Sequence, residues 1–376
     1  MNYADSYTAA FYAAIVDMET WTDSGELKIE SGNVKRTGSS LRHSAQITVH
    51  DFPEDEEKYV RIYMDARQGG ELDHDPVFTG IATSPEHDIN GNITRYPLEL
   101  YSVLKPLEDV KLDRGYYVPA GMTVGAAVRR LLQGIPAPYE IEDGSPMLTD
   151  YIIAEDGETK LSMIDNILDA SGWIMTIDGW GKIHMHSKSN VPVATFSPLQ
   201  DIVEMPIKVK HDWYKCPNVF KAASGDAVAT ERDDDPVSPL STVSRKREVV
   251  AVEMNVTLPG DEDIAQYAKR RLKEEQEAAE SADYPRKFIP NLNIGDVIQM
   301  NYEQIKGLYT VTSQNISLTI NGRTQETVER ALEFAAEEEL ITPVKHSKYL
   351  VMPNDLILVM PDGRALTMPY KTFVSN

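Results

Sequence analysis

The sequence predicts a mainly β protein with an α+β insert, and three observations carry this prediction. Residues 78–94 and 309–324 resemble each other: an aromatic-Thr pair opens each, and Ile-Asn-Gly follows twelve residues later. Asn-Gly between β-rich runs predicts a hairpin, because a two-residue type I′ turn needs φ > 0 at both central positions. The third observation is a pair of amphipathic helical patterns confined to residues 105–195. The candidate turn residues are Asn90, Gly91, Asn321 and Gly322.

The two ribbons indicate a duplicated β domain. A strand-like run precedes each of them, at residues 59–64 and 296–302. A chance likeness between two ordinary hairpins is the alternative, since few residues are identical.

Composition bounds the function classes. The chain has 376 residues, enough for two to four domains. The chain has 37 lysine and arginine residues and 59 aspartate and glutamate residues, which gives a net charge of −22. This argues against a nucleic-acid-binding surface, which needs clustered cations. The acidic net charge is compatible with a channel through which DNA passes without binding. It is equally compatible with a surface whose charge only keeps the protein soluble.

Cysteine content and hydropathy limit the cellular compartments in which the protein is expected. The single cysteine, Cys216, excludes an internal disulfide framework and any multi-cysteine metal site, so we expect a packed structural thiol. The first residues lack a secretory pattern, and no apolar run approaches the ~18 residues of a membrane span. We therefore expect no membrane insertion and synthesis in a reducing cytosol.

The first predicted domain covers residues 1–104. Residues 9–15 suit either a strand or a helical turn. Strands are expected near residues 29–34, 44–50, 59–64 and 96–101, with a polar loop at 65–76. So many short strands with short turns point to a barrel or a sandwich.

Residues 105–195 predict a small α+β domain. One helix is expected from Thr123 to Leu132, and a second from Thr159 to Ser171 that ends at Gly172. Two strands follow, at residues 173–178 and 182–186.

The second predicted β domain covers residues 196–340. Strands are expected at 201–210, 218–223 and 249–258, with a mobile loop at 230–244 and a long helix at 261–282. The charged surface of that helix makes it a candidate inter-subunit contact, through Tyr267, Arg270 and Arg271. After the second ribbon the apolar phase slips by one residue, as a β-bulge would give.

Residues 341–376 predict an apolar, hairpin-like tail. Leu356, Leu358 and Met360 are its candidate contacts with a spike or a neighbouring subunit, because so apolar a segment is expected to be covered.

No catalytic motif is present in the sequence. His184 and His186 share a strand face but lack a third ligand nearby, so we expect no metal site. The acidic pair at residues 155–156 and the run at 233–235 are expected by chance among 59 acids. The sequence therefore predicts no enzyme activity and no cofactor.

Three groups of residues resemble the baseplate hub proteins of tailed phages and phage-tail-like bacteriocins. The resemblance is to hubs of Mu-type and Gram-positive contractile tails, and to the N-terminal part of siphophage tail-associated proteins. The groups are Gly32-Asn-Val with residues 44–49, residues 168–173 with Gly181-Lys-Ile-His, and residues 293–298 with 307–311.

The resemblance implies two tail-tube-like β-barrel domains per chain. Such a chain forms a homotrimer whose six similar domains make a pseudo-sixfold ring, joining the tail tube to a threefold spike or fibre. The implied partners are a second and third copy of the chain, the tail tube protein, a spike or tail fibre protein and the tape measure protein. The resemblance further implies that DNA passes through the ring without specific binding. The implied location is the baseplate of the virion tail, after synthesis in the host cytoplasm.

Two alternatives come from other function classes. A tail-associated peptidoglycan hydrolase would need a catalytic carboxylate or Cys/His set. A carbohydrate-binding receptor module would need exposed aromatic residues, for which Trp173, Trp180 and Trp213 are the candidates, with core packing as the competing role.

Overall fold

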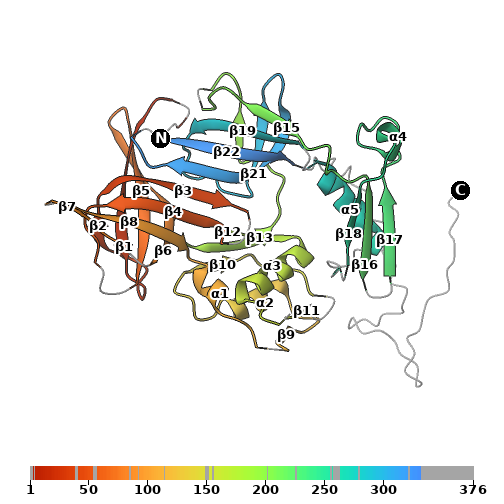
Figure 1. The fold of residues 1–376 in the computed structure, drawn as a ribbon, viewed down its shortest axis with the longest axis horizontal. Helices are drawn as coiled ribbons and strands as arrows, with labels where there is room; N and C mark the ends of the chain where they lie inside the picture. The colour runs from red at the N-terminus through yellow and green to blue at the C-terminus, as the bar shows by residue number, and fades with distance from the viewer. Residues whose placement is uncertain are drawn as a thin grey trace, which may run out of the picture. The chain divides into compact units, whose positions relative to one another are not determined.

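The computed structural model contains a 14-stranded sheet that runs through two β units (Figure 1). It describes residues 3, 5–38, 41–53, 57–83, 86–91, 93–113, 115–148, 152–154, 156–200, 202–224, 227–254, 256, 263–277, 280–320 and 322–331. The predicted mainly β, multi-domain fold class is confirmed. Among the described strands, however, no pairing closes either unit into a separate barrel.

The first β unit holds eight strands in the sheet order β3-β4-β8-β6-β5-β1-β2, with β7 paired to β8. Its core alternates along the strands, as Ala45, Ile47 and Val49 on β4 illustrate. The strands are β1 (Thr8–Val16), β2 (Asp23–Leu27), β3 (Ile29–Thr37), β4 (His43–Val49), β5 (Lys58–Gln68), β6 (Glu71–Thr83), β7 (Asp88–Asn90) and β8 (Ile93–Ser102).

The second β unit repeats the connectivity of the first. Its order β15-β19-β22-β21-β20 matches β3-β4-β8-β6-β5, in the same chain order and with every neighbouring pair antiparallel. A further strand, β14, pairs with β20. This topology supports the duplication that the ribbons predicted. The strands are β14 (Ala194–Phe196), β15 (Lys208–His211), β19 (Glu280–Lys287), β20 (Val297–Asn301), β21 (Lys306–Ser317) and β22 (Arg323–Arg330).

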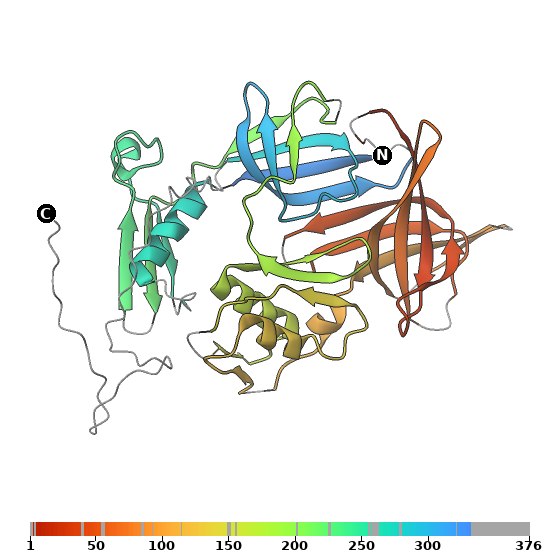
Figure 2. The ribbon, with the colours of Figure 1, turned by 180° about the vertical axis from the view of Figure 1, so that it is seen from behind.

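The α+β unit follows the first β unit (Figure 2). Both predicted helices are confirmed: Thr123 and Thr159 cap α2 and α3 through their hydroxyls, and Gly172 ends α3 at φ +68°. Its hydrophobic cluster also contains Val103 and Leu104 from the end of the first unit. The elements are α1 (Lys105–Asp109), β9 (Tyr117–Val118), α2 (Val124–Leu131), β10 (Tyr139–Ile141), β11 (Ile152–Ile153), α3 (Lys160–Ser171), β12 (Trp173–Ile177) and β13 (Ile183–Ser187).

A separate layer is inserted between β15 and β19, which we call the inserted unit (residues 212–279). Its three strands β16 (Val219–Ser224), β17 (Ala227–Arg232) and β18 (Val250–Glu253) form a sheet in the order β17-β16-β18. Helix α5 (Ile264–Glu277) packs on one face of this sheet, and the short helix α4 (Thr242–Arg245) precedes β18.

Three predictions of secondary structure are wrong in part. The helix expected at 261–282 ends at Glu277, and Glu280–Lys287 is strand β19, whose buried residues alternate and whose Pro285 would break a helix. The loop expected at 230–244 contains the end of β17 and most of α4. The strand expected at 201–210 is reduced to β15, because Pro206 has no N–H to donate to a ladder.

The polar loop expected at residues 65–76 is also wrong. β5 and β6 continue through it as a hairpin whose polar side chains pair across the strands, for example His74 with Asp65 at 2.8 Å. Its two turn residues, Gly69 and Gly70, both have positive φ, as a type I′ turn requires. At the N-terminus, residues 9–15 form strand rather than helix.

The two predicted Asn-Gly turns differ from each other. Asn90 pairs with Ile93, so the first hairpin has a two-residue loop, but Gly91 (φ +64°) is its first central residue and Asn90 ends the strand. The second ribbon has five residues between β21 and β22, and Gly322 lacks a positive φ, so the expected type I′ turn is wrong there. Asn321 lies outside the described residues. The predicted bulge is confirmed at Thr312, where the β21·β22 register shifts.

Candidate assembly interface

Among the described strands, one pair joins the two β units: β3 of the first unit pairs with β21 of the second, and we call this pair the inner joint. One edge of β21 pairs with β20 as far as Thr310 and then with β3 from Ser313 onward. The other edge of β21 pairs with β22. The end of β21 therefore lies between β22 and the edge strand of the first unit, and this makes the sheet continuous (Figure 1).

Arg36 of β3 is fully buried at the inner joint. Its guanidinium donates to the Gln314 and Asn293 side-chain oxygens, both at 3.3 Å, and to the Val77 carbonyl oxygen. Burial and the charge of Arg286 lower the pKa of Arg36 to about 10. A charge in this position costs free energy unless it is hydrogen-bonded, so these partners hold the two units in one register.

Glu326 extends the network into the second unit. It accepts from Arg286 at 2.6 Å, from Tyr284 at 2.8 Å and from the Gln314 amide at 2.8 Å, with every one of these side chains fully buried. Burial lowers the pKa of Arg286 and the Glu326 carboxylate raises it, with a net upward direction. Glu326 therefore connects the core of the second unit to the inner joint through Gln314.

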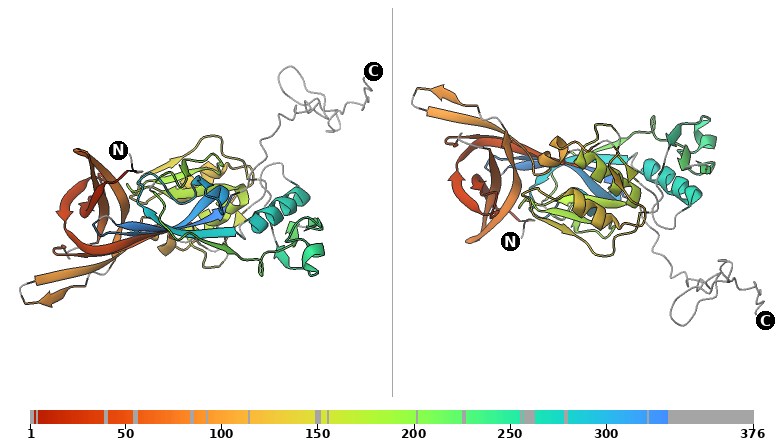
Figure 3. Two further views of the ribbon diagram at one scale, coloured as in Figure 1. Left: turned by 90° about the horizontal axis from the view of Figure 1, so that it is seen from above. Right: turned by 90° about the horizontal axis from the view of Figure 1, so that it is seen from below.

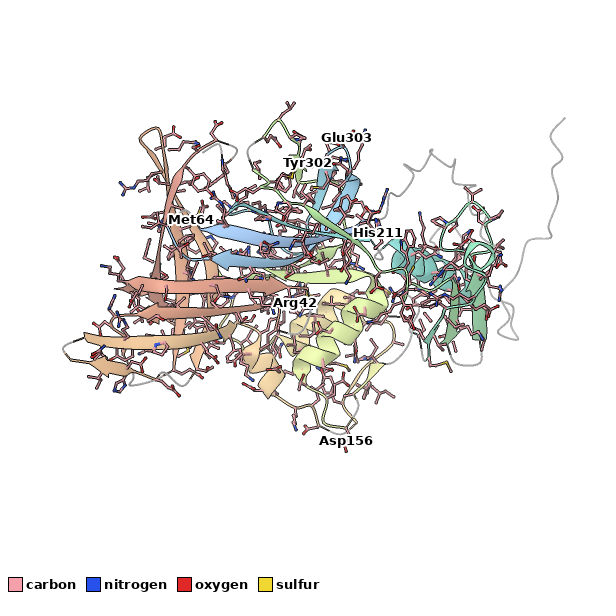
Figure 4. The ribbon with its side chains drawn as sticks, turned by 45° about the horizontal axis from the view of Figure 1, so that its top comes forward. Arg42, Met64, Asp156, His211, Tyr302 and Glu303 are labelled. Atoms are coloured by element: carbon pink, nitrogen blue, oxygen red, sulfur yellow. The ribbon has the colours of Figure 1, made fainter. Side chains whose placement is uncertain are left out.

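Strand β15 is the counterpart of β3 but lies at the end of the sheet, and we call the side on which no described strand pairs with it the open edge. Val34 pairs with Ala45 and Val209 with Ala282, which aligns Asn33-Val-Lys-Arg36 with Lys208-Val-Lys-His211. Val34 is fully buried, whereas Val209 is 38% exposed. Arg36 is likewise buried, and the side chain of His211 is 46% exposed (Figure 4).

The sequence did not single out these residues. Two signals could have found them: the repeated Val-Lys dipeptide in strands that both precede a ribbon, and charged residues in the buried phase of their strands. Arg286 and Glu326 occupy such positions, with buried Tyr284 and Val328 two residues away. A charged residue whose neighbours on the same strand face are apolar is typically a buried side chain in an ion pair.

The candidate helix residues engage their own chain. Tyr267 and Arg271 of α5 both bond Glu253 of β18, at 2.6 and 2.7 Å, and Arg270 bonds Glu274 at 2.8 Å. Their predicted contact with a neighbouring subunit stays a prediction. Leu356, Leu358 and Met360 lie outside the described residues.

Side chains considered for chemistry have structural contacts. Among the described residues no group of three or more His, Cys, Asp or Glu side chains is placed to hold a metal ion. His184 bonds Asp178 at 3.0 Å, and His186 bonds the Ser187 carbonyl oxygen. Burial raises the pKa of Cys216 to about 11, so this thiol stays protonated at neutral pH, as expected of a packed thiol.

The acidic run at residues 233–235 is hydrogen-bonded within the inserted unit. Asp233 accepts from Ser238 at 2.7 Å and from Gln276 at 3.0 Å, and Asp234 accepts from Thr242. These contacts hold the acidic run in the local fold of the loop.

The tryptophans are divided between core and surface. Trp173 is buried in the α+β cluster, as core packing predicted. Trp180 is 48% exposed but lies over the Arg61 guanidinium, and Trp213 is 54% exposed beside His211. The three therefore form no common aromatic surface.

A cleft is lined by charged side chains of α3 and α5 together with Arg42, which is labelled in Figure 4. Arg42 pairs with Asp165 at 2.6 Å. Burial, with the neighbouring Asp165 charge, raises the pKa of Asp169. Arg42 and Arg271, two cations of this cleft, are thus both paired with carboxylates of the same chain. Separately, no helix in the described part of the chain is long and apolar enough to cross a membrane.

Comparison with solved structures identifies the fold. No protein family and no curated protein matches the sequence. A tail protein from Neisseria meningitidis MC58 aligns with a TM-score of 0.62 at 14% identity, over 86% of this chain and 96% of that one. The chain has the fold of phage tail proteins.

Two further tail proteins agree. The 43 kDa tail protein of prophage MuSo2 from Shewanella oneidensis aligns with a TM-score of 0.61 at 14% identity, over 85% of this chain and 98% of that one. Prophage tail protein gp18 from Listeria monocytogenes EGD-e aligns at 0.51 and 13% identity, over 88% and 95%. The resemblance seen in the sequence is thereby confirmed at the level of fold.

Proposed function

We propose that this protein is a structural hub in the baseplate of a phage tail or a phage-tail-like particle. Three copies would form a ring of six similar β units that joins the tail tube above to a threefold spike or fibre below. The observation that carries the proposal is the repeated five-strand order in one chain whose fold is that of phage tail proteins. Two related units per chain are what a trimer needs to match a sixfold tube.

The proposal assigns roles to the parts of the chain. Residues 1–104 and 196–340 are the two tube-like domains, residues 105–195 are a peripheral domain, and residues 341–376 contact the spike or a neighbour. The excess of acidic residues, −22 overall, would repel DNA as it passes through the ring. No catalytic step is part of this role. The partners are further copies of the chain, the tail tube protein, the spike or fibre protein and the tape measure protein.

Sedimentation analysis over a concentration series, with imaging of assembled tails, tests the proposal. We expect a trimer in solution or a three-chain ring at the baseplate. A chain that is monomeric at every concentration and missing from the baseplate would overturn the hub role. Zymography on cell walls addresses the hydrolase alternative, and clearing by the purified chain would support that alternative instead.

A further inference from the structure

We propose that the open edge of β15 in one copy of the chain pairs with the outer edge of β2 in a second copy. The outer edge is the side of β2 that faces away from β1, its neighbour in the sheet. The inference rests on the proposed ring and deepens it, because it names the two strands that join neighbouring copies.

β15 and β2 are the two ends of the 14-stranded sheet, with nine strands between them in the strand order. Among the described strands, β15 pairs only with β19, and β2 pairs only with β1. Figure 1 shows the two strands at opposite ends of the pair of β units. Figure 3 shows the first unit, in red and orange, and the second, mostly in blue, at successive positions along the described chain. The backbone donors and acceptors of an unpaired edge are a ready template for a strand of another chain.

Both edges are exposed in the single chain. All four residues of β15 are exposed, and so are the first four of β2. Val209 of β15 is 38% exposed, whereas its counterpart Val34 is fully buried beside β21. A strand alongside β15 would therefore cover Val209 as β21 covers Val34.

The two edges carry opposite charges. β15 has three basic side chains, Lys208, Lys210 and His211. Residues 17–26, which hold most of β2 and the turn before it, contain four acids and no lysine or arginine. Asp23 of this segment is paired with Arg61 at 2.7 Å, while Glu19 and Glu26 are exposed.

These charges select the occupant. A second β15 placed beside β15 would oppose lysine to lysine, and a second β2 beside β2 would oppose acid to acid. Only the unlike pair brings opposite charges together, and both of its members are present on one chain. Charge therefore favours β2 of a second copy and acts against either self-pairing.

The side chains also match face by face. On β15, Val209 lies opposite the buried Ala282, and the two lysines are on the other face. On β2, the buried Leu27 lies opposite Ala13, and Glu26 is on the other face. When the edges are joined with their core faces on the same side, Val209 shares the face of Leu27, and the lysines share the face of Glu26.

This pairing is heterologous, because two different surfaces of the chain meet, and such an interface closes into a ring when the rotation allows. The inner joint uses β21 where this joint uses β2. The joints around a three-chain ring would therefore alternate between two kinds, which threefold symmetry permits.

Charge reversal in the full-length chain tests the pairing by sedimentation at low salt. We expect Lys208→Glu with Lys210→Glu to weaken self-association about tenfold, because like charges then face each other. Glu19→Lys with Glu26→Lys should weaken it similarly. All four changes in one chain restore the attraction with its signs exchanged, so this chain should associate as the parent does.

The matched control for the lysine variant is Lys221→Glu with Lys269→Glu. Both lysines are exposed on the inserted unit, and the change in net charge is the same. This control should associate as the parent does. If the parent assembles only in tails, the readout for every variant is its occupancy of the baseplate.

Hydrogen exchange tests the backbone pairing directly. On going from the dilute to the assembled chain, the amides of residues 23–27 and 208–211 should exchange more slowly. The amides of β17, an exposed edge strand of the inserted unit, should exchange at an unchanged rate. Unchanged exchange in either of the first two segments overturns the inference.

The outcomes separate this inference from the proposed function. Self-association that survives the single reversals, or that the combined reversal fails to restore, overturns the edge assignment. If the parent still sediments as a trimer, the hub role stands. Reversals that remove the chain from tails while leaving self-association unchanged would assign the edge to another tail protein and also overturn the inference. A parent that forms neither a trimer nor a baseplate ring overturns both.

Discussion

β3 at the inner joint and β15 at the open edge are equivalent strands of the repeat that have different neighbours. Asn33-Val-Lys-Arg36 and Lys208-Val-Lys-His211 share two residues of four and the same place in a five-strand order. Val34 is fully buried and Val209 is 38% exposed. The difference lies in the neighbour: β3 has β21 beside it and β15 has no described strand there. Equivalent positions in a duplicated fold need not share burial, because burial is decided by what packs against them.

The cross-strand partners differ as well. Arg36 is paired with His43 and His211 with Glu280. Two basic groups lie side by side where the strand is buried, and a basic and an acidic group where it is exposed. The buried pair is tolerated because Gln314, Asn293 and a carbonyl oxygen accept from Arg36 and because burial holds the pKa of His43 well below its usual value.

The largest expected effect comes from removing the carboxylate of Glu326, which bonds Gln314 of the inner joint. Glu326→Gln leaves the buried Arg286 guanidinium without its charge partner, so we expect a loss of about 3–5 kcal/mol in the free energy of unfolding. Denaturant titration measures it. The control is Glu303→Gln on an exposed loop (Figure 4), with an expected change within about 0.5 kcal/mol. Equal losses of stability in the two variants would show that the buried Arg286–Glu326 pair contributes no more than an exposed carboxylate does.

The ribbon turns come next. A Cβ at Gly322 would lie 1.9 Å from the Ser317 carbonyl oxygen, so Gly322→Val should cost about 3 kcal/mol, the upper end of overpacking. Gly91 has open space around it, and Gly91→Val should cost about 1–2 kcal/mol through its positive φ alone. Thermal unfolding of both variants measures which substitution lowers the stability more. A larger loss at Gly91 would mean that the close approach at Gly322 relaxes freely.

The smallest effect is a pH dependence at His43. Burial, with the charges of Arg36 and Arg42, lowers its pKa, so below the unfolded value of 6.5 the unfolded chain binds the proton that the folded chain excludes. Stability should therefore fall as the pH drops below about 6.5, by at most about 1.4 kcal/mol per pH unit from this group. His43→Leu should flatten the slope between about pH 7 and 5.5. His50→Gln, on an exposed side chain, should leave the slope unchanged, and an equal change in both variants would assign the slope elsewhere.

Local signals predicted the elements that depend on local chemistry. The caps at Thr123 and Thr159 and the end of α3 at Gly172 follow from side-chain hydrogen bonding and backbone freedom within a few residues. The start of the strand at residues 280–287 was missed, because Glu280–Ala282 continue the helical pattern of the preceding residues and only pairing with β15 and β22 makes them extended.

The candidate interface was harder to predict for the same reason. Glu326 and Arg286 lie 40 residues apart and pair only through tertiary contact. The likeness between β3 and β15 rests on four residues and becomes visible only when strand order is known. The predicted helix contacts at Tyr267, Arg270 and Arg271 followed surface charge. Within the inserted unit, Tyr267 and Arg271 donate to Glu253 and Arg270 donates to Glu274.

The placement of the inserted unit has a consequence for how such a chain could diversify. It leaves the sheet at His211 and returns at Glu280, two residues that are paired across adjacent strands. Because exit and return are neighbours, residues 212–279 could be exchanged for another module, or for a short turn, without altering a strand of the repeat. A lineage could thus replace the inserted unit while the paired strands on either side of it keep their register.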